Sequence, residues 1–237
     1  MERKISFGVN EYYHVYNRGV DKRKIFLTAG DYRRFTTLLY LANTVEPIHW
    51  GNLARLYRGE SSVKFFQHPK GESLVAIGCY CLMPNHFHLL LREIKDGGIS
   101  KFMLKLQTGY SMYFNTKNER KGALWQGVFK AEHATDDEYL QYLFSYIHLN
   151  PTKLLMTDWR ERILSGKMTE KLYRYVVDYP YSSCRLYNPQ SSTTINKVES
   201  TIVDRENFPN YLAVNTKEYR DHLINWLTLN KNEGSPR

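Results

Sequence analysis

The chain has 237 residues, of which 42% are hydrophobic and 24% charged, as in an ordinary soluble globular protein of one domain, or of one domain with an appended piece. Its formal net charge of +9 favours a polyanionic partner, nucleic acid before an anionic membrane surface. The three cysteines form no CxxC pair and no even framework, which argues against a disulfide scaffold or a zinc finger. No signal segment or long apolar run is present, which predicts a soluble cytoplasmic protein without a membrane segment.

The first predicted elements are a strand, a helix and an insertion. Residues 11–17 are aromatic and β-branched and precede Arg18-Gly19, a pattern that predicts a strand followed by a turn. Over 31–44 the apolar residues recur at helical spacing and predict a helix. The stretch 46–72 has a mixed composition, and we interpret it as an insertion with two short strands, LARLY (53–57) and VKFF (63–66).

Residues 73–93 predict an antiparallel hairpin. The β-branched and aliphatic content of 73–82 and 86–93 indicates two strands. Met83-Pro84-Asn85 is the predicted turn, because a proline cannot sit inside a central strand. Cys79 and Cys81 are expected to be buried thiols of the first strand.

The later elements are two helices around another strand. Ser100 is the predicted N-cap of a helix over 101–116, on which Tyr110 and Tyr113 share the core face, and 124–134 is a predicted strand. Thr135 to Glu138 form a capping box, T-x-x-E, for a helix that ends at Asn150, because Pro151 disfavours the α conformation before it. Residues 159–187 are expected to be helical or irregular, 191–200 a polar linker and 211–229 a final helix.

The order of elements defines the predicted fold. Without the insertion it is β, α, β-β, α, β, α, which predicts an α+β fold, ferredoxin-like, with helices packed against a mainly antiparallel sheet. We expect one domain over 1–158, with the insertion at about 46–72, and a partly helical C-terminal extension over 159–237.

Two histidines enter the second strand of the hairpin. Side chains alternate faces along a strand, so His86 and His88 are expected to point the same way and Phe87 the other. Such a pair either lies on a half-exposed strand or holds a metal ion. Imidazole ligands alone suit zinc, copper, iron or nickel, and two of them leave the coordination shell incomplete.

The helix that ends at Asn150 carries a second stripe beside its apolar core face. Tyr139, Tyr142, Tyr146 and Asn150 form this stripe, with Tyr146 and Asn150 one turn apart. If the stripe packs over the sheet near the two histidines, the amide oxygen of Asn150 is a third metal ligand. His148 points away from Tyr146 and is predicted to lie on the surface.

Three motifs in this order and spacing resemble one family. MPNHFHLLL (83–91), LWQGVFK (124–130) and YIHLNP (146–151) are similar to the REP-associated tyrosine transposases, which are single-tyrosine HUH transposases of bacterial insertion sequences. YHVYNRG (13–19) and YPYSS (179–183) are weaker landmarks. The resemblance covers about residues 11–156, extends loosely to about 188, and leaves 46–72 and 190–237 without a matching motif.

The resemblance implies a ferredoxin-like or RRM-like HUH endonuclease core and a defined chemistry. His86 and His88 match the metal-binding histidines, Tyr146 the nucleophile and Asn150 a further metal ligand. The implied cofactor is Mg²⁺ or Mn²⁺. The implied partner is single-stranded DNA with a hairpin, cleaved to a 5′-phosphotyrosine adduct and a free 3′-OH by a monomer or homodimer associated with the bacterial nucleoid.

Several basic, aromatic and amide side chains are candidate DNA contacts, and other functions stay open. A replication initiator or relaxase of the same superclass is one alternative, although relaxases usually carry the tyrosine upstream of the histidines. A non-catalytic binder of hairpin DNA or RNA and a nuclease that uses water are the others. The candidate contacts are Arg18, Arg92, Lys105, Arg120, Lys121, Trp125, Gln126 and Lys130.

Overall fold

The computed structural model describes residues 5–156, 158, 165, 170–187, 198–209, 221 and 223. Its centre is a four-stranded sheet in the order β2-β3-β1-β4, in which every neighbouring pair is antiparallel. The bounds are β1 (Tyr12–Arg18), β2 (Val75–Met83), β3 (His86–Glu93) and β4 (Lys130–Ala134). The predicted α+β fold with a mainly antiparallel sheet is confirmed, and this strand order is the ferredoxin-like one.

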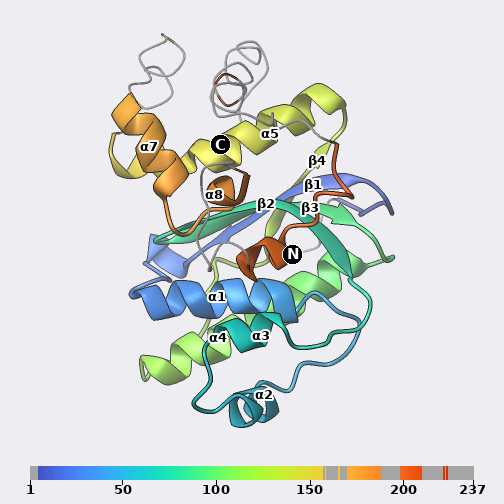
Figure 1. The fold of residues 1–237 in the computed structure, drawn as a ribbon, viewed down its shortest axis with the longest axis vertical. Coiled ribbons are helices and arrows are strands. Elements are labelled where there is room, and N and C mark those ends of the chain that lie inside the picture. Colours follow the sequence, from blue (N-terminus) through green and yellow to red (C-terminus); the bar gives the residue numbers. More distant parts are fainter. Residues whose placement is uncertain are drawn as a thin grey trace.

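Helices cover both faces of the sheet (Figure 1). On one face lie α1 (Ala29–Leu41) and α4 (Gly98–Lys117), and on the other α5 (Asp137–Leu149), α7 (Glu170–Asp178) and α8 (Cys184–Tyr187). Strand β3 divides its side chains between the two layers: Phe87 and Leu89 join the core with α1 and α4, and Leu90 joins the core with α5. Because both faces are covered, β2 is buried along its whole length.

The insertion departs from its prediction. LARLY and VKFF fall in helices, α2 (Trp50–Leu56) and α3 (Val63–Phe66), rather than in strands. Leucine, alanine and arginine are good helix formers, and α3 packs on α1 instead of at a sheet edge. The periodicity of such short apolar runs does not separate a strand from a helix turn.

Two predicted helix starts were also wrong, because other side chains cap these helices. Helix α4 begins at Gly98, with Ser100 inside it, since the Glu93 carboxylate accepts hydrogen bonds from the backbone N–H groups of Gly98 (3.1 Å) and Ile99 (2.7 Å). Helix α5 has Asp136 as its N-cap, accepting from the Tyr139 N–H at 2.7 Å, in place of the predicted Thr135 capping box.

The predicted strand over 124–134 is shorter, and the C-terminal predictions are met only in part. Only Lys130–Ala134 form β4, because Leu124 and Trp125 turn into the core beneath α1 and α4. Helices α7 and α8 fall within the region expected to be helical or irregular, and they share a core with α5 and β2. The predicted helix over 211–229, apart from residues 221 and 223, and most of the linker over 191–200 lie outside the described residues. The domain boundary at 158 stays a prediction.

No helix in the described part of the chain is long and apolar enough to cross a membrane.

Asp31 joins the start of α1 to the end of α4, and its loss is expected to destabilise the protein. Its buried carboxylate accepts from the backbone of Leu27 and Thr28, both at 2.8 Å, from Tyr113 Oη at 2.9 Å and from Lys117 Nζ at 2.6 Å. Burial raises the pKa of Asp31, but these donors outweigh burial and lower it overall. We expect Asp31→Asn to lower the free energy of unfolding at pH 7 by roughly 1–3 kcal/mol.

The pH dependence of that loss follows from the sign of the shift. A carboxylate whose pKa is lowered by folding stabilises the native state above its unfolded pKa of about 4, and this stabilisation disappears as the pH falls through the folded pKa. Urea unfolding should therefore show a smaller difference between Asp31→Asn and wild type at pH 3 than at pH 7. The exposed Asp21→Asn variant is the control and should match wild type at both pH values. An undiminished difference at pH 3 would contradict the assignment.

Candidate active site

The two histidines of β3 lie side by side on the face of the sheet that α5 covers. Their ring centroids are 5.0 Å apart, with the planes at 87° to each other. Phe87 between them is fully buried in the opposite layer, as strand alternation requires. His88 is buried, while His86 at the start of the strand is partly exposed.

Helix α5 places Tyr146 over these histidines. The Tyr146 ring centroid lies 5.8 Å from that of His88, with an edge-on angle of 84°. Tyr142 stacks on Tyr146 from the preceding turn, with centroids 5.8 Å apart. Tyr146 keeps 7% of its surface exposed, whereas Tyr110 is fully buried in the opposite layer and donates to the Ile25 carbonyl at 2.6 Å. The fold thus brings Tyr146 and His88 together although they are far apart in sequence.

Asn150 is buried at the end of α5. Its Nδ2 donates to the backbone carbonyl of Tyr146 at 2.8 Å, and its Oδ1 has no hydrogen-bond partner among the described residues. No hydrogen bond within the described part of the chain joins Asn150 to either histidine. The hydrogen bond to the Tyr146 carbonyl, one turn earlier, therefore orients the Asn150 side chain. Its amide oxygen remains available to another ligand.

Burial keeps both imidazoles of β3 neutral. Burial, followed by the positive charges of Lys153 and Arg18, lowers the pKa of His86 to about 4. Burial, followed by the neighbouring His14 and His86, lowers the pKa of His88 well below its ordinary value. A neutral imidazole offers the lone pair that metal binding requires.

Lys153 is a residue of the candidate site that the sequence pattern did not predict. Its Nζ donates to Tyr146 Oη at 3.2 Å and lies 4.8 Å from the centre of the Tyr146 ring. It belongs to the 3-10 helix η2 (Asn150–Leu154), which continues the chain directly after α5. Tyr146, Asn150 and Lys153 are spaced so that all three lie on one side of a helix. This spacing is the sequence signal that points to Lys153.

Strands β1 and β4 contribute a second missed pair, His14 and Glu132. His14 Nε2 lies 2.8 Å from His88 Nδ1, and His14 Nδ1 lies 3.6 Å from Glu132 Oε2. Burial lowers the pKa of His14, although Glu132 opposes this shift. The alternation of Tyr12, His14 and Tyr16 on β1 was visible in the sequence, but their common face with His88 depends on strand pairing.

Some predicted DNA contacts share the histidine face. Arg18 pairs in register with His86, and Lys130 lies opposite Tyr16, which itself pairs with His88. The Arg18 guanidinium contacts the side chain of Gln126, another of the predicted residues. Arg92 lies at the far end of β3, where it donates to Asn207 Oδ1 at 2.7 Å. Arg18, Gln126 and Lys130 are therefore the candidates nearest to the histidine pair.

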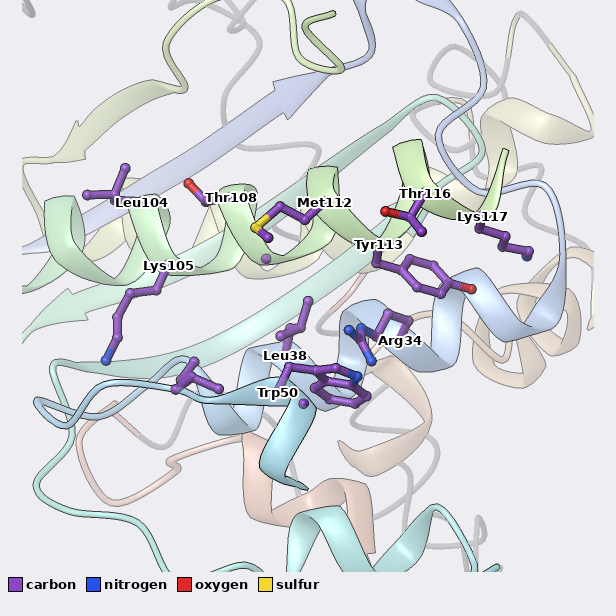
Figure 2. A pocket seen from close by; sticks show the side chains of 13 residues that line it. Arg34, Leu38, Trp50, Leu104, Lys105, Thr108, Met112, Tyr113, Thr116 and Lys117 are labelled. Carbon is purple, nitrogen blue, oxygen red and sulfur yellow. The ribbon is translucent and has the colours of Figure 1, made fainter. Parts of the chain in front are cut away.

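Other predicted DNA contacts lie away from the histidines. Trp125 packs between α1 and α4 and donates to the Gln107 carbonyl at 3.1 Å. Arg120 donates to Asn115 Oδ1 at 2.8 Å in the loop after α4, and Lys121 beside it is exposed. Lys105 lines a cavity of about 860 Å³ between α1, α2 and α4, at the end away from Lys117 (Figure 2). This cavity belongs to the layer opposite the histidine pair.

The prediction for His148 was wrong. This imidazole is fully buried, and its Nε2 lies 2.9 Å from Ser183 Oγ. It does point away from Tyr146, but the segment around α8 covers that side of α5. Cys79 and Cys81 are buried free thiols, as predicted.

The donor atoms fit a divalent ion with an incomplete protein shell. His88 Nε2 and Asn150 Oδ1 are buried polar atoms without a hydrogen-bond partner among the described residues, and such atoms are normally satisfied. Within the described ranges, no group of three His, Cys, Asp or Glu side chains is placed to hold a metal. An ion here would therefore draw on the Asn150 amide and on oxygen atoms of substrate or water, which Mg²⁺ and Mn²⁺ favour.

Comparison with known proteins supports the resemblance seen in the motifs. Residues 59–150 match the family described as "Transposase IS200 like". No curated protein matches the chain. Among solved structures, a REP-associated tyrosine transposase bound to a REP hairpin is similar with a TM-score of 0.44 and 14% identity, over 77% of this chain and 82% of that chain. The predicted resemblance is confirmed by the match over residues 59–150, which include His86, His88, Tyr146 and Asn150.

Proposed function

We propose that this protein is a metal-dependent DNA strand transferase that cleaves and rejoins single-stranded DNA through Tyr146. The observation that carries the proposal is the position of the Tyr146 ring, 5.8 Å from His88 with Lys153 Nζ on its phenol oxygen. A phenol beside neutral imidazoles and a cation is suited to attack on a phosphodiester. The family match and the motif order support the same reaction class.

The reaction exchanges one phosphodiester bond for another. Tyr146 Oη bonds to phosphorus as the phenol proton passes to water, and the bond from phosphorus to the 3′ oxygen breaks. The 3′ oxygen takes up a proton, which leaves a free 3′-OH and a 5′-phosphotyrosine. Because no phosphodiester bond is hydrolysed, a 3′-OH can reverse the step and rejoin a strand.

The chain's own residues have separate tasks in this step. A phenol with a pKa near 10 is a weak nucleophile at pH 7. Lys153 donates to the phenol oxygen, so its positive charge lies beside the atom that loses its proton in the step. His86, His88 and Asn150 would hold Mg²⁺ or Mn²⁺, which when bound polarises a non-bridging phosphate oxygen. Arg18 and Lys130 lie on the same face of the sheet and suit backbone phosphate contacts.

The substrate we propose is single-stranded DNA next to a hairpin. This choice follows from the resemblance of MPNHFHLLL and YIHLNP to the REP-associated tyrosine transposases. The net charge of +9 agrees with a nucleic-acid partner.

Incubation with a 5′- or 3′-labelled single-stranded hairpin DNA and Mn²⁺ tests the proposal. We expect an adduct that survives SDS together with a product ending in 3′-OH. Release of a 5′-phosphate without any adduct would instead identify a nuclease that uses water. Tight binding without either product would identify a hairpin-binding protein.

Lys153 gives a sharper test of how the nucleophile is activated. We expect Lys153→Met to slow adduct formation by roughly 100-fold, within the range of acid–base assistance. Hairpin DNA binding, measured by filter retention, should change much less, because Lys153 is one of 33 Lys and Arg residues in the chain. Lys153→Arg keeps the charge and should recover part of the rate. An unchanged rate in Lys153→Met would remove Lys153 from the mechanism.

A further inference from the structure

Behind the histidine pair the structure joins four side chains in a row, through two hydrogen bonds and one longer contact between His14 and Glu132. His88 Nδ1 faces His14 Nε2 at 2.8 Å, and the His14 ring stacks on it with centroids 5.0 Å apart. Glu132 lies on the other side of His14, with its Oε2 3.6 Å from His14 Nδ1. Tyr16 Oη donates to the other carboxylate oxygen, Oε1, at 2.8 Å. No motif or family match assigns a role to His14 or Glu132.

Strand pairing brings these four side chains together. His14 lies directly opposite Glu132 on β4, and Tyr16 lies opposite His88 on β3, so all four side chains leave the same face of the sheet. Tyr139 on α5 adds a second phenol, which donates to Glu132 Oε2 at 3.4 Å. Three elements thus hold the carboxylate at the outer end, and the fully paired β1 holds His14.

The chemistry of these groups determines which ring nitrogens of His14 and His88 carry protons. Glu132 Oε2 lies 3.6 Å from His14 Nδ1, and the negative charge of this carboxylate favours the tautomer of a neutral His14 that carries its proton on Nδ1. His14 Nε2 then carries a lone pair, and it accepts from Nδ1–H of His88. The remaining His88 nitrogen, Nε2, is left with its lone pair, and like His14 Nδ1 it is a buried atom without a hydrogen-bond partner among the described residues.

We infer that His14 and Glu132 are positioning residues that fix His88 in the tautomer with Nδ1 protonated, so that Nε2 is presented to a divalent cation. This inference rests on the proposed function for the identity of the cation site. A histidine that ligates a metal usually donates its other N–H to a partner, and removal of such a partner typically lowers metal affinity 10- to 100-fold. Here that partner is a second histidine, which is itself oriented by a carboxylate.

The first measurement is made on metal-free protein without DNA. Long-range ¹H–¹⁵N spectra of histidine-labelled protein at about pH 7.5 report which ring nitrogen of His88 carries the proton. We expect Nδ1 to be protonated in wild type, and a mixture of tautomers in His14→Phe, where the acceptor is lost. His88 protonated on Nε2 in wild type would overturn the inference. This outcome would leave the adduct assay for Tyr146 unaffected, whereas missing adduct with the expected tautomer would overturn the proposed function alone.

The second measurement is Mn²⁺ affinity, from the electron paramagnetic resonance signal of the free ion. We expect His14→Phe to bind Mn²⁺ roughly 10- to 100-fold more weakly, and Glu132→Gln to show a smaller loss. His14→Gln restores an acceptor oxygen and should recover part of the affinity. His133→Phe is the matched control, because it removes an imidazole of β4 that contacts Glu11 on the other face. Wild-type affinity in both His14→Phe and Glu132→Gln would contradict the inference, and Glu132→Gln alone decides if His14→Phe does not fold.

Discussion

Replacement of Tyr146 by phenylalanine is expected to abolish the covalent protein–DNA adduct. The substitution removes only the phenol oxygen, which is the atom that Lys153 contacts and the proposed nucleophile. Phenylalanine keeps the edge-on ring contact with His88 and the stacking on Tyr142, so the fold and DNA binding should persist. Adduct on an SDS gel should fall by at least about 1,000-fold, because no other step replaces a lost nucleophile.

Tyr142→Phe is the matched control for this result. Tyr142 lies one turn earlier on α5, stacks on Tyr146 and is almost completely buried. We expect this variant to form the adduct at nearly the wild-type rate. If the adduct persists in Tyr146→Phe and disappears in Tyr142→Phe, the nucleophile is Tyr142 and not Tyr146.

The second large effect is expected for His88→Ala. His88 is buried between His14 and Tyr146, and its unpartnered Nε2 is the atom proposed to bind the cation. Its loss should weaken Mn²⁺ binding and slow adduct formation by roughly 100-fold or more, since it removes a proposed ligand and leaves His14 without its partner. Both quantities are measured on the same preparation, after circular dichroism has verified the fold.

The pattern across variants separates a ligand from a structural histidine. His133→Ala removes an imidazole of β4 on the other face and should leave both quantities unchanged. His88→Ala with normal Mn²⁺ affinity but no adduct would place His88 at the substrate rather than at the cation. Normal affinity and normal cleavage together would remove it from the site.

The parts of the site that depend on local geometry were predictable from the sequence. Alternation along a strand was enough to place His86 and His88 on one face, and the order of elements was enough for the ferredoxin-like arrangement of the sheet. The spacing of Tyr146 and Asn150 predicted two neighbours at the end of one helix, and the Asn150 side chain does contact the Tyr146 backbone.

What escaped prediction depends on contacts between distant segments. His14 and Glu132 reach His88 only through the pairing of β1 with β3 and β4, and sequence spacing carries no record of that register. His148 was predicted to lie on the surface because the pattern of α5 alone does not reveal the segment that covers it, which brings Ser183 to its ring. The start of α4 was misplaced because Glu93, a residue at the end of β3, caps it in place of Ser100.

The most direct test of the central claim is to identify the amino acid that carries the DNA. The adduct formed with hairpin DNA and Mn²⁺ is digested with nuclease and then with trypsin, and the nucleotide-bearing peptide is sequenced by tandem mass spectrometry. We expect a 5′-phosphonucleotide on Tyr146. A nucleotide on Tyr16, Tyr139 or Tyr142, or on a residue other than tyrosine, would contradict it.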